Sequence, residues 1–286
     1  DERARWLQVL GDEPAAKAAL AAAEADLRLA WQFLERDGEH YWDFLLRRAE
    51  HHRLKGEWKE YLEDLALTTQ VDSDLVPSRM WVAHFTGLRR AAERALMASR
   101  AAGTPPQGPA GKRADDLARE ALQIAKKGIS WARTRGEALT RDQWIEAARV
   151  ILVNDMALAA DVDRTPLHGL LTWYVEQAAS TSPPPWAAPE LAESQLLSLQ
   201  GALSLLEAKV LKRRGKTDEA AAQEEAAQAK ASRAVTMREA IGAAGGVRPS
   251  SCPYLVLSYV LRERGQPQPA LETMKRAIEA GQTNPE

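Results

Sequence analysis

The segment 103–112 is the part of the chain that comes nearest to a phosphate-binding loop, because it combines glycines with a lysine. A loop of that kind follows the pattern G-x-x-x-x-G-K-[ST], in which backbone N–H groups and the lysine hold phosphate oxygens and the hydroxyl holds magnesium. In this chain Pro106 occupies the first glycine position, and Arg113 replaces the magnesium-binding residue. The segment therefore predicts an exposed Pro/Gly-rich loop and no nucleotide site.

Metal-ligating side chains gather at His40, His51 and His52, with Glu50 beside them in the sequence. Adjacent residues on a helix point about 100° apart, and no H-E-x-x-H motif brings two histidines onto one face. We therefore expect helix-surface histidines and no metal. The single cysteine, Cys252, excludes an intramolecular disulfide and the usual zinc patterns, and we expect a small buried thiol.

Catalytic patterns are absent from the sequence. Paired carboxylates such as Asp115-Asp116 and Glu224-Glu225 diverge on a helix and do not flank a common substrate atom. No G-x-S-x-G motif marks a nucleophile. We expect a protein that is not an enzyme and has no cofactor, and the alternative is an α-helical enzyme whose site combines the histidines with distant carboxylates.

Positive charges gather where one predicted helix ends, at Lys209, Lys212, Arg213, Arg214 and Lys216. Cations at this position interact favourably with the helix dipole and can cap free carbonyls. Alternatively, they form a clamp for an anion or an acidic peptide. We take Lys209, Lys212, Arg213 and Arg214 as candidate partner-binding residues. A second basic stripe is predicted at Arg89, Arg90, Arg94 and Arg100.

All nine tryptophans precede the last third of the chain. Large aromatic side chains at helical spacing usually fill a core, and Trp31 and Trp42 have that spacing relative to neighbouring leucines. Trp58 follows a glycine turn, and Trp186 follows three consecutive prolines. We take Trp58 and Trp186 as candidate exposed anchors for a partner.

The composition limits the class of partner. The 286 residues include 38 Lys and Arg against 40 Asp and Glu, a net charge of -2 that gives no general attraction to nucleic acid or to an anionic membrane. No apolar run approaches the roughly 20 residues that span a bilayer. We expect a cytoplasmic protein without membrane insertion. Because the chain begins at Asp1 and not Met, a missing N-terminal region would allow a periplasmic or membrane-anchored context.

Helix-forming residues dominate, so the sequence predicts an all-α fold. Helices are expected at about 15–36, 39–55, 58–69, 77–101, 114–135, 141–162 and 166–180, followed by two helical hairpins. The prolines at 183–185 predict a Pro-rich linker at 182–188 between an irregular helical domain, 1–181, and a C-terminal domain, 189–286.

The two C-terminal hairpins share one pattern of small residues around a glycine. The first copy is Ala208, Leu211, Gly215, Ala220 and Ala227, and the second is Ser258, Leu261, Gly265, Ala270 and Ala277. Ala49, Gly56 and Leu65 form a weaker third copy. The pattern resembles the tetratricopeptide repeat (TPR), and the resemblance implies a right-handed superhelical array of antiparallel helical hairpins, here with irregular helix lengths.

The resemblance implies a non-enzymatic scaffold or adaptor that holds a peptide or protein partner in a helical-repeat groove. The segment 23–65 also resembles the repeat arms of STAND signalling ATPases, with Glu24, Leu27, Ala30 and Trp31 before the next glycine turn. That resemblance implies a ligand-sensing arm as the alternative. The partner, the oligomeric state and the binding face are open from sequence.

Overall fold

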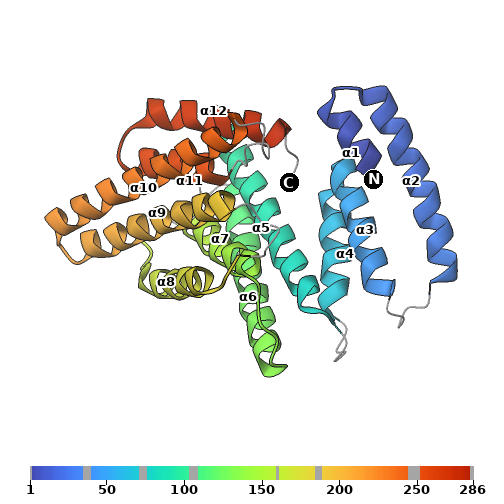
Figure 1. Cartoon of the computed structure of the whole chain (residues 1–286), viewed down its shortest axis with the longest axis horizontal. Coiled ribbons are helices and arrows are strands. Elements are labelled where there is room, and N and C mark those ends of the chain that lie inside the picture. Colours follow the sequence, from blue (N-terminus) through green and yellow to red (C-terminus); the bar gives the residue numbers. More distant parts are fainter. Residues whose placement is uncertain are drawn as a thin grey trace. The chain divides into compact units, whose positions relative to one another are not determined.

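The computed structural model describes residues 2–34, 40–70, 76–102, 109–158, 161–183, 189–243 and 252–283. Within these ranges the chain is helical and contains no strand, which confirms the predicted all-α class (Figure 1). The helices are α1 Glu2–Val9, α2 Glu13–Phe33, α3 His40–Lys55, α4 Trp58–Gln70, α5 Ser78–Ala101, α6 Pro109–Thr134, α7 Arg141–Ala157, α8 Thr165–Ser180, α9 Pro189–Arg213, α10 Thr217–Ala243, α11 Cys252–Glu263 and α12 Pro267–Thr283.

The chain divides into two compact units. Unit 1 is Asp1–Ala138 and contains α1 to α6, and unit 2 is Leu139–Glu286 and contains α7 to α12. Consecutive helices pack against each other within each unit. This division lies at a different point from the boundary expected at 182–188, since α8 and α9 pack together inside unit 2. Residues 184–188 of that expected linker lie outside the described residues.

Glycines with positive φ lie at the turns of the three helical hairpins predicted from the sequence. Gly56, Gly215 and Gly265 have φ angles of 79°, 76° and 73°. At the second of these turns the Gly215 N–H donates to Lys212 O at 3.0 Å and the Lys216 N–H donates to Leu211 O at 3.1 Å. This Schellman pattern recurs at the other two turns and favours glycine, which has no Cβ to strain the left-handed conformation. The three predicted glycine turns are confirmed.

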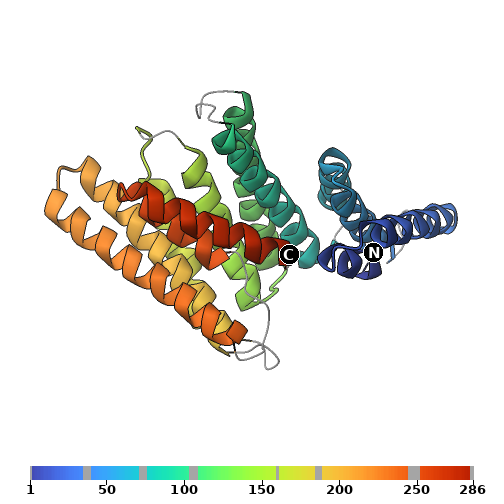
Figure 2. The ribbon, with the colours of Figure 1, turned by 90° about the horizontal axis from the view of Figure 1, so that it is seen from above.

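Small side chains let α9 and α10 approach closely along much of their length, as both ribbon views show (Figures 1 and 2). A Cβ added at Gly201 would lie 3.1 Å from Ala227 O and 3.2 Å from Ala231 N. The Ser194 hydroxyl donates to Ala234 O across the same interface at 2.8 Å. The repeat-like alanines of α10, Ala220 and Ala227, are fully buried. These small residues lie at a helix contact, as their pattern predicts.

The core of unit 1 lies among α3 to α6. Trp42 is buried with Met80 and packs near Trp81 and Trp131, which confirms the core role predicted for Trp42. A Cβ at Gly128 would lie 2.6 Å from the Trp81 Cβ, so α5 and α6 also approach closely. The core role predicted for Trp31 is wrong, because the residue is 36% exposed, with its ring packed against Phe44 of α3 at a centroid distance of 5.4 Å.

Several helix boundaries differ from those predicted. Helix α6 begins at Pro109, inside the expected loop, because proline fits the first helical position. Residues 103–108 of that loop lie outside the described residues. Helix α7 begins as predicted after Thr140, which forms a capping box with Gln143, but it ends at Ala157 and not near residue 162.

Candidate functional site

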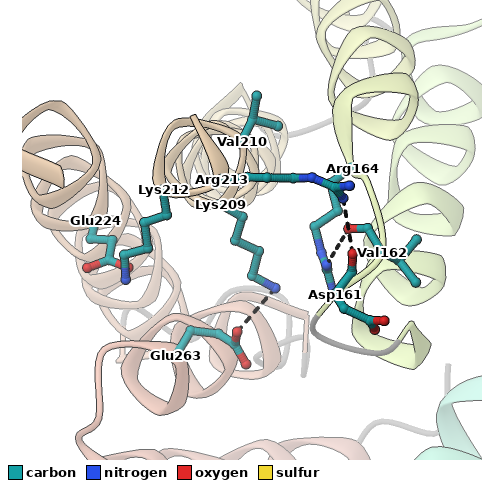
Figure 3. Close-up of a pocket in the computed structure, with 9 residues that line it drawn as sticks. All are labelled: Asp161, Val162, Arg164, Lys209, Val210, Lys212, Arg213, Glu224 and Glu263. Carbon is teal, nitrogen blue, oxygen red and sulfur yellow. Dashed lines mark hydrogen bonds and ion pairs between the residues drawn. The ribbon is translucent and has the colours of Figure 1, made fainter. Parts of the chain in front are cut away.

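A cavity of about 550 Å³ opens on unit 2, among α9, α10, α11 and the segment that precedes α8 (Figure 3). Its lining is mostly charged. The lining residues are the acids Asp161, Glu224 and Glu263, the cations Arg164, Lys209, Lys212 and Arg213, and the apolar Val162 and Val210. Three of the predicted partner-binding residues therefore lie in one cavity.

Helix α9 positions these predicted cations. Lys209, Lys212 and Arg213 have i, i+3 and i+4 spacing, which places them on one face of the last turns of the helix. The turn at Gly215 then reverses the chain, so that Glu224 on α10 faces Lys212. Glu263 is the last residue of α11 and lies against Lys209.

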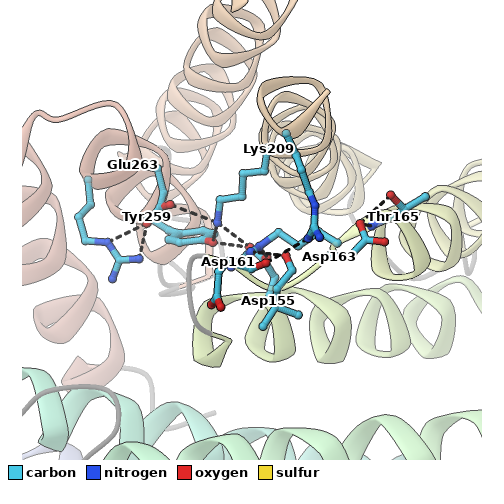
Figure 4. Close-up of polar contacts among 11 residues, drawn as sticks. Asp155, Asp161, Asp163, Thr165, Lys209, Tyr259 and Glu263 are labelled. Carbon is cyan, nitrogen blue, oxygen red and sulfur yellow. Dashed lines mark hydrogen bonds and ion pairs between the residues drawn. The ribbon is translucent and has the colours of Figure 1, made fainter. Parts of the chain in front are cut away.

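A buried polar network lies behind this cavity (Figure 4). Its centre is the carboxylate of Asp155 on α7, whose side chain is fully buried. Arg164 donates its Nε–H to Asp155 Oδ1 at 2.5 Å, and Lys209 donates from Nζ to Oδ2 at 3.0 Å. The Tyr259 hydroxyl donates to the same Oδ2. The network joins α7, α9, α11 and the N-cap of α8, and it holds the wall of the cavity in place.

The electrostatics of the network follow from burial and neighbouring charge. Burial raises the pKa of Tyr259 well above its usual value, and the negative charges of Asp155 and Glu263 raise it further. Burial acts to raise the pKa of Glu263 as well, but the positive charges of Lys209 and Arg262 outweigh it and lower that pKa. Tyr259 is therefore a neutral hydrogen-bond donor near neutral pH, and Glu263 is an anion that neutralises Lys209.

The cations of the cavity divide into inner and outer ones. Lys209 lies 3.2 Å from Glu263 and also binds Asp155, so its charge is compensated within the protein. Lys212 forms an ion pair with Glu224 across the α9–α10 hairpin. Lys209 and Lys212, both predicted as partner-binding residues, therefore stabilise the wall of the cavity through these ion pairs. Both side chains are held by carboxylates of other helices, an arrangement that neither the capping interpretation nor the clamp interpretation predicted.

Arg213 lines the cavity, Arg214 is the next residue in the chain, and both are exposed; we call these two arginines the rim. Arg213 donates from Nη1 to the backbone oxygen of Asp161 at 3.0 Å, an interaction with a neutral carbonyl. Arg214 follows in the glycine turn and is not among the residues that line the cavity. Hydrogen bonds from the Thr165 N–H and hydroxyl lower the pKa of Asp163, and the positive charges of Arg213 and Arg214 add to this effect. Asp163 is therefore an anion near these two cations.

The predicted aromatic anchors do not belong to this cavity. Trp58 begins α4 in unit 1 and lines a separate pocket there, with the Arg94 guanidinium 5.0 Å above its ring. Trp186 lies outside the described residues. The predicted second basic stripe is not one exposed surface, because Arg89 is 2% exposed and forms an ion pair with Glu93.

His51, His52 and Cys252, considered above for metal binding or reactivity, are buried or paired within the protein. The expected helix-surface position is wrong for His51, which is buried, and His52 Nδ1 lies 2.7 Å from Glu57 Oε2. In the described part of the chain, His, Cys, Asp and Glu side chains form no group of three suited to a metal ion. Cys252 is buried, as expected. Among the described helices, none has both the length and the apolar composition needed to span a bilayer.

Sequence reasoning did not identify Asp155, Arg164, Tyr259 or Glu263 as parts of a site. One signal was present, because Asp155 interrupts the buried face of a helix whose preceding residues are the apolar run 150–153. A buried charge requires partners. Its partners lie up to 104 positions away in the sequence, so spacing does not reveal them.

Comparisons of the chain with protein-family models, with curated proteins and with solved structures give no match.

Proposed function

We propose that this chain is a non-enzymatic interaction protein whose arginines at the rim of the unit 2 cavity bind acidic side chains of a peptide or protein partner. The observation that carries the proposal is the contrast between inner and outer cations. Lys209 and Lys212 are paired with carboxylates, whereas Arg213 and the next residue, Arg214, are exposed, and Arg213 donates to a neutral backbone carbonyl. Guanidinium groups bind carboxylates with two parallel hydrogen bonds.

The architecture supports a binding role as well. Helices packed in sequence, small residues at the α9–α10 contact and repeated glycine turns are features of helical-repeat proteins, which bind partners on extended surfaces. A TPR-like, right-handed superhelical array is part of this proposal. The buried network around Asp155 would keep the rim rigid, so that little conformational entropy is lost on binding.

The test is a binding measurement with an array of short peptides that differ in acidic content. Peptides selected by the wild-type chain are then titrated in solution by fluorescence anisotropy. Replacing Arg213 and Arg214 by Glu should weaken the affinity for acidic peptides by about tenfold or more, because two attractions become repulsions. Raising the salt concentration should weaken wild-type binding in the same direction.

A matched control carries the same change in charge elsewhere on unit 2. Arg233 on α10 and Lys275 on α12 are exposed and do not line the cavity. The double variant Arg233→Glu with Lys275→Glu should keep wild-type affinity. Equal loss of binding in both double variants would reduce the effect to net charge and refute the role of the rim.

A further inference from the structure

The pocket beside Trp58 in unit 1 has a lining unlike that of the unit 2 cavity. It measures about 300 Å³, and its surface is mostly apolar. Trp58 and Leu62 from α4, Ala91, Ala95 and Ala98 from α5, and Leu117 from α6 supply this surface. The volume is at the lower end of the ~300–1,000 Å³ typical of small-molecule sites.

Two arginines complete the lining, and no carboxylate among the described residues pairs with either of them. Arg94 on α5 stacks over the Trp58 ring, and Arg113 lies on the second turn of α6. Both side chains are exposed, and neither has a carboxylate partner within the described part of the chain. This differs from the unit 2 cavity, where Lys209 and Lys212 are neutralised by the protein's own acids.

The Trp58 indole forms part of the pocket wall. Its Nε1 is buried and has no acceptor among the residues that the structure describes. The ring is fixed from two sides, since Tyr61 packs edge-on against it at a centroid distance of 5.6 Å.

We propose that this pocket binds a small organic anion, a carboxylate or sulfonate with an aromatic or alkyl body. The body would contact the alanines of α5 and the leucines, and the anionic group would lie between Arg94 and Arg113. Charge complementarity decides the class of ligand, because two exposed guanidinium groups beside an apolar surface favour an anion over a neutral or cationic molecule. The site is independent of the partner-binding rim proposed for unit 2.

The test uses 8-anilinonaphthalene-1-sulfonate, which has an aromatic body and one sulfonate and becomes fluorescent in apolar surroundings. The full chain should bind one equivalent at this pocket, and octanoate should displace it. N-phenyl-1-naphthylamine, a neutral molecule of similar shape, should bind more weakly. The variant Arg94→Gln with Arg113→Gln should raise the Kd for the sulfonate by about tenfold or more while leaving the Kd for the neutral molecule nearly unchanged.

The control variant is Lys126→Gln with Lys127→Gln, which removes the same charge from exposed positions of α6 outside the pocket. It should bind the sulfonate as the wild type does. Trp58→Phe should abolish energy transfer from Trp58 to the bound probe. Equal affinity for the sulfonate and the neutral molecule, an unchanged Kd in the arginine variant, or binding of acidic peptides alone at this pocket would overturn the proposal. The Arg213/Arg214 variant should bind the sulfonate as the wild type does. The result for this pocket is therefore independent of the result for the rim of unit 2.

Discussion

Replacing Asp155 by Asn tests the buried network of unit 2 most directly. The substitution preserves the size of the side chain, so it creates no cavity, but it removes the charge that Arg164 and Lys209 share. Both cations have side chains less than one fifth exposed. The amide also brings an NH₂ group toward donors that now face a carboxylate oxygen. We therefore expect unit 2 to lose stability.

The magnitude follows from the number of partners and their burial. Removing one member of a buried ion pair costs about 3–5 kcal/mol, because the remaining charge stays desolvated without compensation. Asp155 has two cationic partners and also accepts a hydrogen bond from Tyr259, so the upper half of that range is expected. For a unit of this size each kcal/mol lowers Tm by ~2–4 °C, which gives a decrease of about 8–20 °C.

Hydrogen exchange measured by mass spectrometry in increasing urea separates the two units. Amide protection should fall in residues 139–286 of the Asp155→Asn protein and stay unchanged in unit 1. The matched control is Glu219→Gln, the same chemical change at a side chain that is 58% exposed and pairs with Lys216. Exposed pairs of this kind contribute ~0–1 kcal/mol.

A double-mutant cycle adds a second check on the same network. Lys209→Met should cost less in the Asp155→Asn protein than in the wild type, because the cation has by then lost a main partner. If Asp155→Asn costs no more than Glu219→Gln, the carboxylate does not stabilise unit 2 in the way argued.

Two further predictions concern packing and pH. Gly128→Ala should destabilise unit 1 by ~1–3 kcal/mol, because its Cβ would lie 2.6 Å from the Trp81 Cβ. Gly169→Ala should stabilise α8 by about 0.5–1 kcal/mol, because no atom lies within 4 Å of its added Cβ. If urea unfolding gives both variants a change of the same sign, this account of the packing is wrong. Burial lowers the pKa of His84 to about 4, so the folded state favours the neutral ring. Its contribution is complete above pH ~6.5 and is lost as the pH falls toward 4, by about 3 kcal/mol in all. The free energy of unfolding of His84→Gln should therefore fall less steeply over that interval, and an NMR titration showing an ordinary histidine pKa would disprove the effect.

Local features of the fold could be predicted from the sequence because they depend on residues close together in the chain. The helical class follows from composition, and the turns at Gly56, Gly215 and Gly265 follow from the freedom of glycine at positive φ. Thr140 and Gln143 cap α7 through bonds across a single turn. The basic cluster at the end of α9 was visible for the same reason, since one helix face presents residues three and four apart.

Interactions between distant segments were decided by the tertiary structure alone. Asp155, Arg164, Lys209 and Tyr259 meet because α7, α9 and α11 pack together, and no short spacing connects them. That packing assigned Lys209 and Lys212 to ion pairs within unit 2 and left Arg213 and Arg214 at the rim. It also left Trp31 exposed, although the spacing of that residue predicted burial. A sequence specifies which face of a helix is apolar or charged, but burial and pairing depend on what lies opposite that face in three dimensions.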